Sequence, residues 1–171
     1  MDLVVSISSK GAVLNWGDGP RRCAIGPAGI AVKSKEGDGI TPQGTFPLRE
    51  IFYRADRVAN PKSVLPVRAT EPNDGWCDAP ADAHYNQLVK LPYTASAENM
   101  WRDDSLYDLV AVVGFNDDPV VPGKGSAIFL HLAKPDYLPT AGCVALSEAD
   151  LRAALAQLRP GDKIRIAQIS A

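Results

Sequence analysis

Hydrophobic and polar residues alternate along this chain in short runs that are separated by glycine and proline. This pattern is typical of many short strands joined by turns. The expected strands are a hairpin over residues 3–16, a third strand at 23–26, a longer strand at 46–53, neighbouring strands at 109–115 and 126–132, and a closing strand at 163–166.

One segment has the apolar spacing of a helix. Ser147 is a good N-cap, and two acidic residues follow it in what would be the first turn. Leu151, Leu155 and Leu158 recur at helical intervals, and Pro160-Gly161 ends the pattern. The prediction is a mostly β, β-rich α+β domain that contains one firm C-terminal helix.

The 171 residues suffice for a single domain, 1–171, with a core of its own. Within it, residues 54–108 are irregular, polar and rich in proline. A loop-rich insertion of this length inside a compact domain is usually a lid or a binding wall. His84, Tyr85 and Asn86 lie in its middle and are candidates to face a ligand, although each could equally satisfy loop backbone groups.

Composition excludes several classes of function. The net charge of −2 and the scattered basic residues leave no footprint for nucleic acid. The longest apolar run, 109–115, is too short to span a membrane. The glycine-rich segment 33–46 lacks the features of a phosphate loop. Three cysteines without a Cys-x-x-Cys pair favour neither a disulfide framework nor a zinc site, so no metal or other cofactor is expected.

No positive segment followed by an apolar core precedes the first expected strand at 3–7. A secretory signal is therefore not visible. The expected location is the cytoplasm, or the periplasm if a leader has been removed.

The chemistry of the chain concentrates in one stretch. His131 ends an apolar strand, and Thr140-Ala141-Gly142-Cys143 follows a short proline-bearing loop. An imidazole that takes the proton of a nearby thiol produces a strong nucleophile. Gly142 allows a sharp turn that exposes backbone N–H groups for an oxyanion. The residues alone leave a nucleophile and a buried structural cysteine open for Cys143, while a metal ligand lacks companions.

This stretch resembles the catalytic signature of the YkuD-type L,D-transpeptidases, a histidine on a strand followed by Ser/Thr-x-Gly-Cys. The resemblance covers nearly the whole chain and points to the single-domain, leaderless branch of the family. It extends to the segments Gly37–Phe46, Gly75–Asp78, Tyr85-Asn86, Asn116–Pro119 and Gly125–Phe129.

The resemblance implies a mixed-sheet β-sandwich and acyl transfer on peptidoglycan stem tetrapeptides. Cys143 would attack the carbonyl of diaminopimelate or lysine, release the terminal D-alanine and form a thioester, with His131 as its base. The N–H groups of Gly142 and Cys143 would hold the oxyanion, and Thr140 would orient the histidine or the loop. A carbapenem is then an expected covalent ligand of Cys143.

The chain departs from the family at Ala141, where many members carry a second histidine, and at Ala145, where they carry Arg or Asn. The roles of these missing side chains must fall to other residues. The candidates for substrate binding lie in the insertion. A cation is needed for the D-alanine carboxylate, and Arg102 and Arg54 are candidates. The full set of insertion candidates comprises His84, Tyr85, Asn86, Trp101 and Arg102.

Three functions follow from the resemblance. L,D-transpeptidation is the assignment at family level. The short interval of twelve residues between His131 and Cys143 and the missing leader fit an L,D-carboxypeptidase that trims soluble muropeptides from tetrapeptide to tripeptide. A silent wall-binding module is the third, and the intact His131 and Cys143 argue against it. Papain-like proteolysis lacks its local signature.

Overall fold

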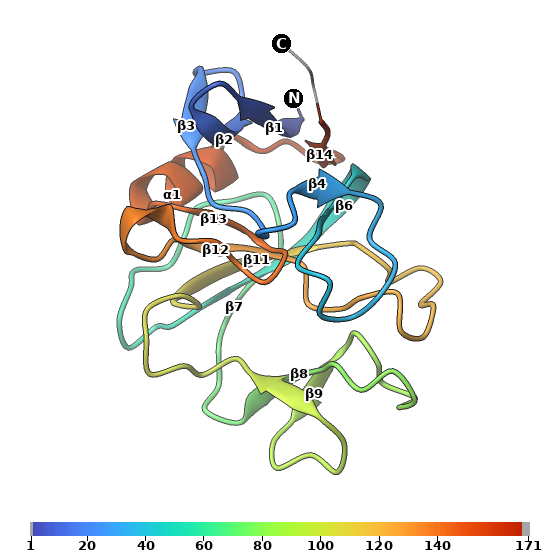
Figure 1. Cartoon of the computed structure of the whole chain (residues 1–171). Helices are drawn as coiled ribbons and strands as arrows, with labels where there is room; N and C mark the ends of the chain where they lie inside the picture. Colours follow the sequence, from blue (N-terminus) through green and yellow to red (C-terminus); the bar gives the residue numbers. More distant parts are fainter. Residues whose placement is uncertain (1, 169–171) are drawn as a thin grey trace.

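The structure is a computed structural model that describes residues 2–168, and these residues form a β-rich fold with one α-helix (Figure 1). The elements are β1 (Leu3–Ser8), β2 (Gly11–Asn15), β3 (Pro20–Arg22), β4 (Ile30–Ala31), β5 (Thr41–Pro42), β6 (Gly44–Tyr53), β7 (Val67–Ala69), β8 (Asp74–Cys77), β9 (Leu88–Lys90), β10 (Ala97–Asn99), β11 (Leu109–Val113), β12 (Phe129–Leu132), a 3₁₀ turn η1 (Pro135–Tyr137), β13 (Val144–Leu146), α1 (Glu148–Gln157) and β14 (Lys163–Ile166).

The main sheet has nine strands and mixed direction. Its order is β13-β12-β11-β6-β14-β1-β2-β3, and β7 pairs with β6 outside this path. The pairs β12–β13, β1–β14 and β6–β7 are parallel, and the other neighbours run antiparallel. The parallel pair β12–β13 brings together the two segments on which the candidate catalytic residues lie.

The larger core explains how the sheet curves. Apolar residues of β1 and β2, such as Leu3 and Leu14, belong to the same buried cluster as Leu130 and Val144 from the far end of the sheet. The two ends of the sheet therefore share one core, and the mixed sheet agrees with the predicted β-rich fold. Helix α1 adds Leu151 and Leu155 to this cluster, which is the apolar face expected from the sequence.

The opposite face of β11 and β12 carries a second core. Phe129 and Val112 pack there against Trp76, Met100 and other residues of the insertion. The insertion builds a small sheet of its own with the order β10-β8-β9, which lies below the main sheet in Figure 1. The segment predicted as an irregular wall is thus a layer with its own backbone pairing, packed onto the sheet by aromatic side chains.

The predicted elements agree with the structure except at three places. The strand expected over 109–115 ends at Val113. The prediction of a third strand at 23–26 is wrong. The strand β3 lies at Pro20–Arg22, and within 23–26 only Ala24 forms a β-bridge, to Ala145. The strand expected from residue 126 begins only at Phe129, because Ala127 has a left-handed backbone with φ of 53°. The helix is confirmed, with Ser147 as its N-cap.

Candidate active site

Strand alternation places His131 and Cys143 on the same face of the sheet. Leu130 and Leu132 point into the larger core, so Phe129 and His131 point to the face of the insertion. On the neighbouring strand His131 is paired in register with Ala145. Cys143 lies two residues before Ala145 and shares its face, which sets the thiol diagonally beside the histidine.

The turn before Cys143 requires glycine. Gly142 has a φ of +138°, and a Cβ built there would come within 2.8 Å of the carbonyl oxygen of Ile40. That carbonyl belongs to the segment before β5, and the neighbouring Thr41 is fully buried and accepts a hydrogen bond from the N–H of Gly26. The structure therefore packs the glycine-rich segment directly against the turn that carries Cys143.

Thr140 forms hydrogen bonds within this turn and, among the described residues, none with the histidine. Its Oγ1 donates to the carbonyl of Cys143 at 2.7 Å and accepts from the N–H of Gly142 at 3.1 Å. Both hydrogen bonds lie within the loop that carries Cys143. The N–H of Gly142 is already engaged, which leaves the N–H of Cys143 as the better oxyanion donor of the pair.

The thiol of Cys143 is held by backbone groups. Its Sγ donates to the carbonyl of Ala127 at 3.2 Å and accepts from the N–H of Phe129 at 3.4 Å. Burial raises the pKa of Cys143 to about 12, and the negative charge of Glu98 acts in the same direction. The resting state is therefore a neutral thiol whose proton is directed at a carbonyl.

His131 is also neutral at rest. Its Nδ1 lies 2.8 Å from the carbonyl oxygen of Leu132, and because a carbonyl only accepts, Nδ1 carries the proton. Nε2 then has a free lone pair that can accept a proton. Burial lowers the pKa of His131 to about 4. The ring of Tyr107 meets the imidazole edge to face, with centroids 5.3 Å apart.

A cavity of about 160 Å³ joins the two residues. His131, Cys143 and the two alanines that depart from the family pattern line it, together with Arg102 and Lys134. Arg102 is paired with Asp104 through two hydrogen bonds of 2.8 and 2.6 Å. Lys134 has an exposed side chain and makes no ion pair with any described residue.

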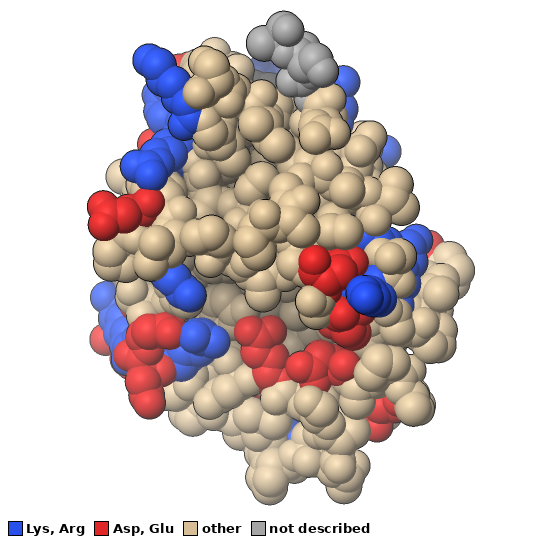
Figure 2. Space-filling model, viewed as in Figure 1, with Lys and Arg blue, Asp and Glu red and all other residues tan. Residues whose placement is uncertain are grey.

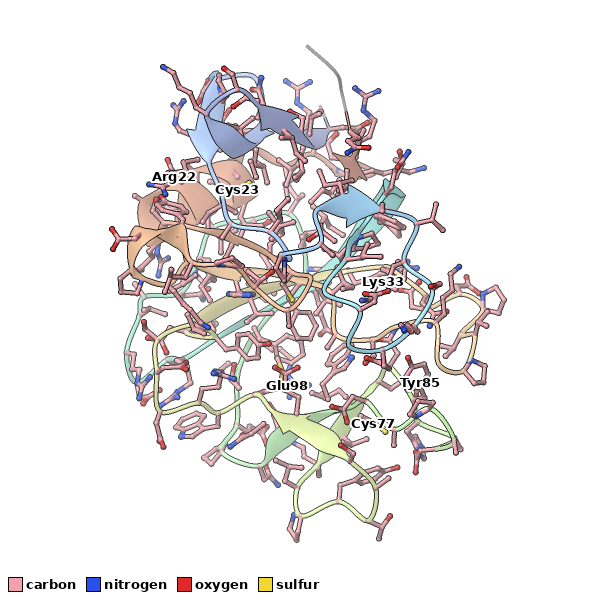
Figure 3. The ribbon with its side chains drawn as sticks, viewed as in Figure 1. Arg22, Cys23, Lys33, Cys77, Tyr85 and Glu98 are labelled. Atoms are coloured by element: carbon pink, nitrogen blue, oxygen red, sulfur yellow. The ribbon has the colours of Figure 1, made fainter. Side chains whose placement is uncertain are left out.

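A second cavity, of about 200 Å³, lies on the other side of Cys143. The charged residues in its wall are Lys33, Glu36, Asp78 and Glu98. Four residues line both cavities and therefore lie between them: Glu98, Tyr107, Ala141 and Cys143. Figure 3 shows Glu98 on the side of the insertion's small sheet that is turned toward the main sheet, and Lys33 above it in this view. The nucleophile candidate thus lies between two cavities with different charge.

Most of the insertion candidates have structural roles. His84 is mainly exposed and contacts Tyr93, and the buried Tyr85 bonds to Glu36 and to the N–H of Gly125. Asn86 is buried and fills all its bonding sites with the Trp76 ring nitrogen and three backbone groups. None of these three candidates lines either cavity beside Cys143.

Of the two candidate cations, the structure brings only Arg102 to the site. Arg54 binds Asp56 and the carbonyl of Arg102, and its guanidinium lies 3.5 Å over the ring of Trp101. The ring of Trp101 is therefore covered by the Arg54 guanidinium, and Trp101 does not line either cavity.

Sequence reasoning missed Glu98, Tyr107 and Lys134. Tyr107 donates a hydrogen bond to Glu98, and its ring contacts both His131 and Phe129. Burial raises the pKa of Glu98 above its usual range, while the bond from Tyr107 opposes that rise. No motif marks these residues, and only the apolar pattern that follows Tyr107 indicated that it begins a buried segment.

The sequence matches one known family. The family model of the YkuD L,D-transpeptidase catalytic domain matches residues 2–166. The chain belongs to this family. No curated protein and no solved structure gives a significant match. Membership supports L,D-transpeptidase-type activity on the peptides of peptidoglycan.

Residues 2–168 also bear on membrane and metal sites. No described helix has the length and apolar character needed to cross a membrane. Within the same residues, no group of three or more histidine, cysteine, aspartate or glutamate side chains is arranged to hold a metal ion.

Proposed function

We propose that this L,D-transpeptidase-family domain transfers the acyl group of a peptidoglycan stem tetrapeptide through a thioester on Cys143, with release of the terminal D-alanine. The observation that carries the proposal is the shared cavity of His131, on β12, and Cys143, directly before the parallel neighbouring strand β13.

The first half of the reaction begins with a neutral thiol and a neutral imidazole. His131 accepts the Cys143 proton at Nε2 as Sγ bonds to the carbonyl carbon of the L-centre. Because the pKa of Cys143 is raised and that of His131 is lowered, this proton moves together with the attack and not before it. The N–H of Cys143 stabilises the oxyanion. The C–N bond then breaks, and His131 returns the proton to the departing amine of D-alanine.

The leaving group is an amino acid with a free carboxylate, and the cavity beside His131 offers two cations for it. Lys134 is the stronger candidate because its ammonium is unpaired among the described residues, whereas Arg102 is already bound by Asp104. A cation at this position would hold the carboxylate while the peptide nitrogen receives its proton.

The second half of the reaction resolves the thioester. An amine acceptor attacks the carbonyl, loses a proton to His131 and gives a 3→3 cross-link, while the sulfur recovers its proton. Water in the same role gives the tripeptide and makes the enzyme an L,D-carboxypeptidase. The small size of the cavity next to His131 favours this second candidate, because it admits water more easily than a polymer-linked amine.

The test is incubation with a disaccharide tetrapeptide, with and without an amine acceptor, followed by mass spectrometry. The wild type is expected to show a transient acyl adduct that is absent in Cys143→Ala, and a carbapenem is expected to label Cys143 in the same way. A cross-linked dimer indicates transpeptidation, and tripeptide alone indicates carboxypeptidation. If no adduct and no released D-alanine appear with a folded wild type, the proposal is wrong and the silent module is favoured.

A further inference from the structure

A buried ion pair lies beside Cys143, and the proposed mechanism does not use it. Lys33 and Asp38 form this pair, and their side chains are only 3% and 6% exposed. Taking two charges out of water is costly, so such a pair needs further hydrogen bonds to hold it. Lys33 lines the cavity beside Cys143 that His131 does not line, and it is the only cation among the described residues that do so. A positive charge is therefore held near the thiol, away from the proposed base.

The surroundings of the pair fix the position of its ammonium. The Asp38 carboxylate accepts hydrogen bonds from the N–H of Ile40 at 3.0 Å and from the N–H of Ser34 at 3.3 Å. The stem of Lys33 packs against Gly125, where a Cβ would come within 2.6 Å of Lys33 Cε. The carboxylate is thus held by the backbone around it, and the lysine stem fills the space that the glycine leaves.

The segment that the pair closes, residues 33–40, packs against the turn that carries Cys143. The Ile40 carbonyl oxygen lies within 2.8 Å of the place that a Cβ of Gly142 would take. A Cβ at Gly26 would in turn come within 3.1 Å of Gly142 Cα. These contacts are between backbone atoms, which yield less than the end of a flexible side chain. The ammonium and the turn before the thiol therefore keep a fixed relative position.

The thiol lies between charges of opposite sign. Burial raises the pKa of Cys143, Glu98 raises it further, and the Lys33 ammonium opposes this rise. The other charged residues among the described lining of the cavity are the acids Glu36, Asp78 and Glu98. Figure 2 shows acidic side chains along the lower edge of the hollow at the middle of this face. A fixed cation offsets this negative environment and needs no reorganisation when the thiol loses its proton.

We infer that Lys33 is a further positioning residue for the acyl transfer. Its ammonium, held by Asp38, stabilises the negative charge that develops on the sulfur of Cys143 as the proton passes to His131. The inference rests on the proposed function. Lys33 takes no proton and forms no covalent bond in the reaction, so it acts only through Cys143. The site then divides two tasks: His131 receives the proton, and Lys33 lowers the cost of the charge that is left behind.

The test compares two neutral substitutions in the same ion pair. Lys33→Met removes the cation and keeps a stem of similar length, whereas Asp38→Asn removes the anion and keeps the cation. The double variant Lys33→Met/Asp38→Asn removes both charges, so that neither is left unpaired in the interior. Lys35 is exposed and belongs to the same segment, and it supplies the control Lys35→Met. Urea unfolding establishes that each variant is folded before its reactivity is measured.

The measured quantity is the rate at which iodoacetamide alkylates Cys143 at about pH 8, read by peptide mass mapping. Loss of a nearby opposite charge raises the pKa of a thiol by about one unit, so its thiolate fraction falls about tenfold. The more basic thiolate is also more nucleophilic, which offsets part of this loss. Alkylation should therefore be about threefold slower in Lys33→Met and in the double variant. It should be no slower than in the wild type in Asp38→Asn, which keeps the cation, and in Lys35→Met.

An unchanged or higher alkylation rate in the folded double variant would overturn the inference. Equal slowing in Asp38→Asn would also overturn it, because that pattern assigns the effect to the fold of residues 33–40 and not to the charge of Lys33. Acylation by a tetrapeptide, read by intact mass, should slow by a similar factor in the two variants that lack the cation, and an unchanged acylation rate would refute a role in the transfer.

The two measurements separate this inference from the proposed function. If the wild type is acylated and the variants without the cation are alkylated at the wild-type rate, the proposed function stands and the inference fails. If those variants are alkylated slowly but the wild type is never acylated, Lys33 stabilises the thiolate as inferred and the proposed function fails.

Discussion

The protonation of the Cys143 thiol at rest determines how fast it should react with an alkylating reagent. Burial raises the pKa of the thiol to about 12 from a reference of 9.0, and the Glu98 carboxylate adds to this rise. At pH 7 such a thiol is ionised in about one molecule in 10⁵, compared with about one in 10² for the reference. The thiolate fraction of Cys143 at neutral pH should therefore be about 10³-fold smaller than that of an ordinary thiol, and its alkylation should be slower.

The shape of the pH profile is more decisive than the absolute rate. Restricted access slows alkylation at every pH, but only the thiolate fraction changes with pH. Below its pKa, the rate at Cys143 should rise about tenfold for each pH unit, without a plateau between about pH 6 and about pH 10. Removal of a nearby negative charge in Glu98→Gln should lower the pKa of Cys143 and raise the rate at pH 7, with the same slope.

The assay is alkylation by excess iodoacetamide, quenched at intervals and read by peptide mass mapping. Mapping is needed because Cys23 and Cys77 are also free thiols. Cys143→Ala serves as the control that identifies the labelled peptide. A rate that is high and constant around neutral pH would refute the reasoning, because it would mean that Cys143 rests as a thiolate paired with protonated His131.

Two further predictions concern stability. Asn86→Ala removes a side chain that accepts hydrogen bonds from two donors and donates to two carbonyls. We expect the free energy of unfolding, measured in urea, to fall by about 3 kcal/mol. The control Gln87→Ala, at an exposed neighbouring position, should leave it nearly unchanged. Burial lowers the pKa of His131 in the folded protein to about 4 from 6.5. Between these pH values the unfolded chain therefore binds a proton that the folded protein does not. The free energy of unfolding should fall by up to about 3 kcal/mol as pH drops through this range. His131→Gln should remove this part of the pH dependence; a dependence that stays unchanged would assign it to other groups.

Part of the site was visible in the sequence because local signals agree with the tertiary outcome there. Ser147 and the leucine spacing after it predict α1 with its N-cap, and the cap bond is formed. The motif around Gly142 and Cys143 predicts a sharp turn, and the positive φ of Gly142 supplies it. Such features depend on residues close together in the chain, so pattern and propensity are sufficient to predict them.

The rest depended on contacts between distant residues. Asn86 resembles a candidate ligand in the sequence, yet it fastens the insertion to the backbone of residues 115–116 and 127. Glu98 and Lys134 have no local signal, and strand pairing places them around Cys143. The insertion suggested only a loop, because prolines interrupt the alternation that would have shown its three-stranded sheet.

The sequence by itself therefore predicted the first hairpin, the strands that became β6, β11 and β14, and the helix, and it pointed to Cys143 and His131 as candidate thiol and imidazole, since these follow from spacing and from residue chemistry. Only the tertiary structure decided the protonation of Cys143 and His131 and the charge of the cavities beside them. The physical reason is that pKa values and cavity charge are set by burial and by neighbours in space. These neighbours come from β10, β12, β13 and the segments around them, which no local pattern brings together.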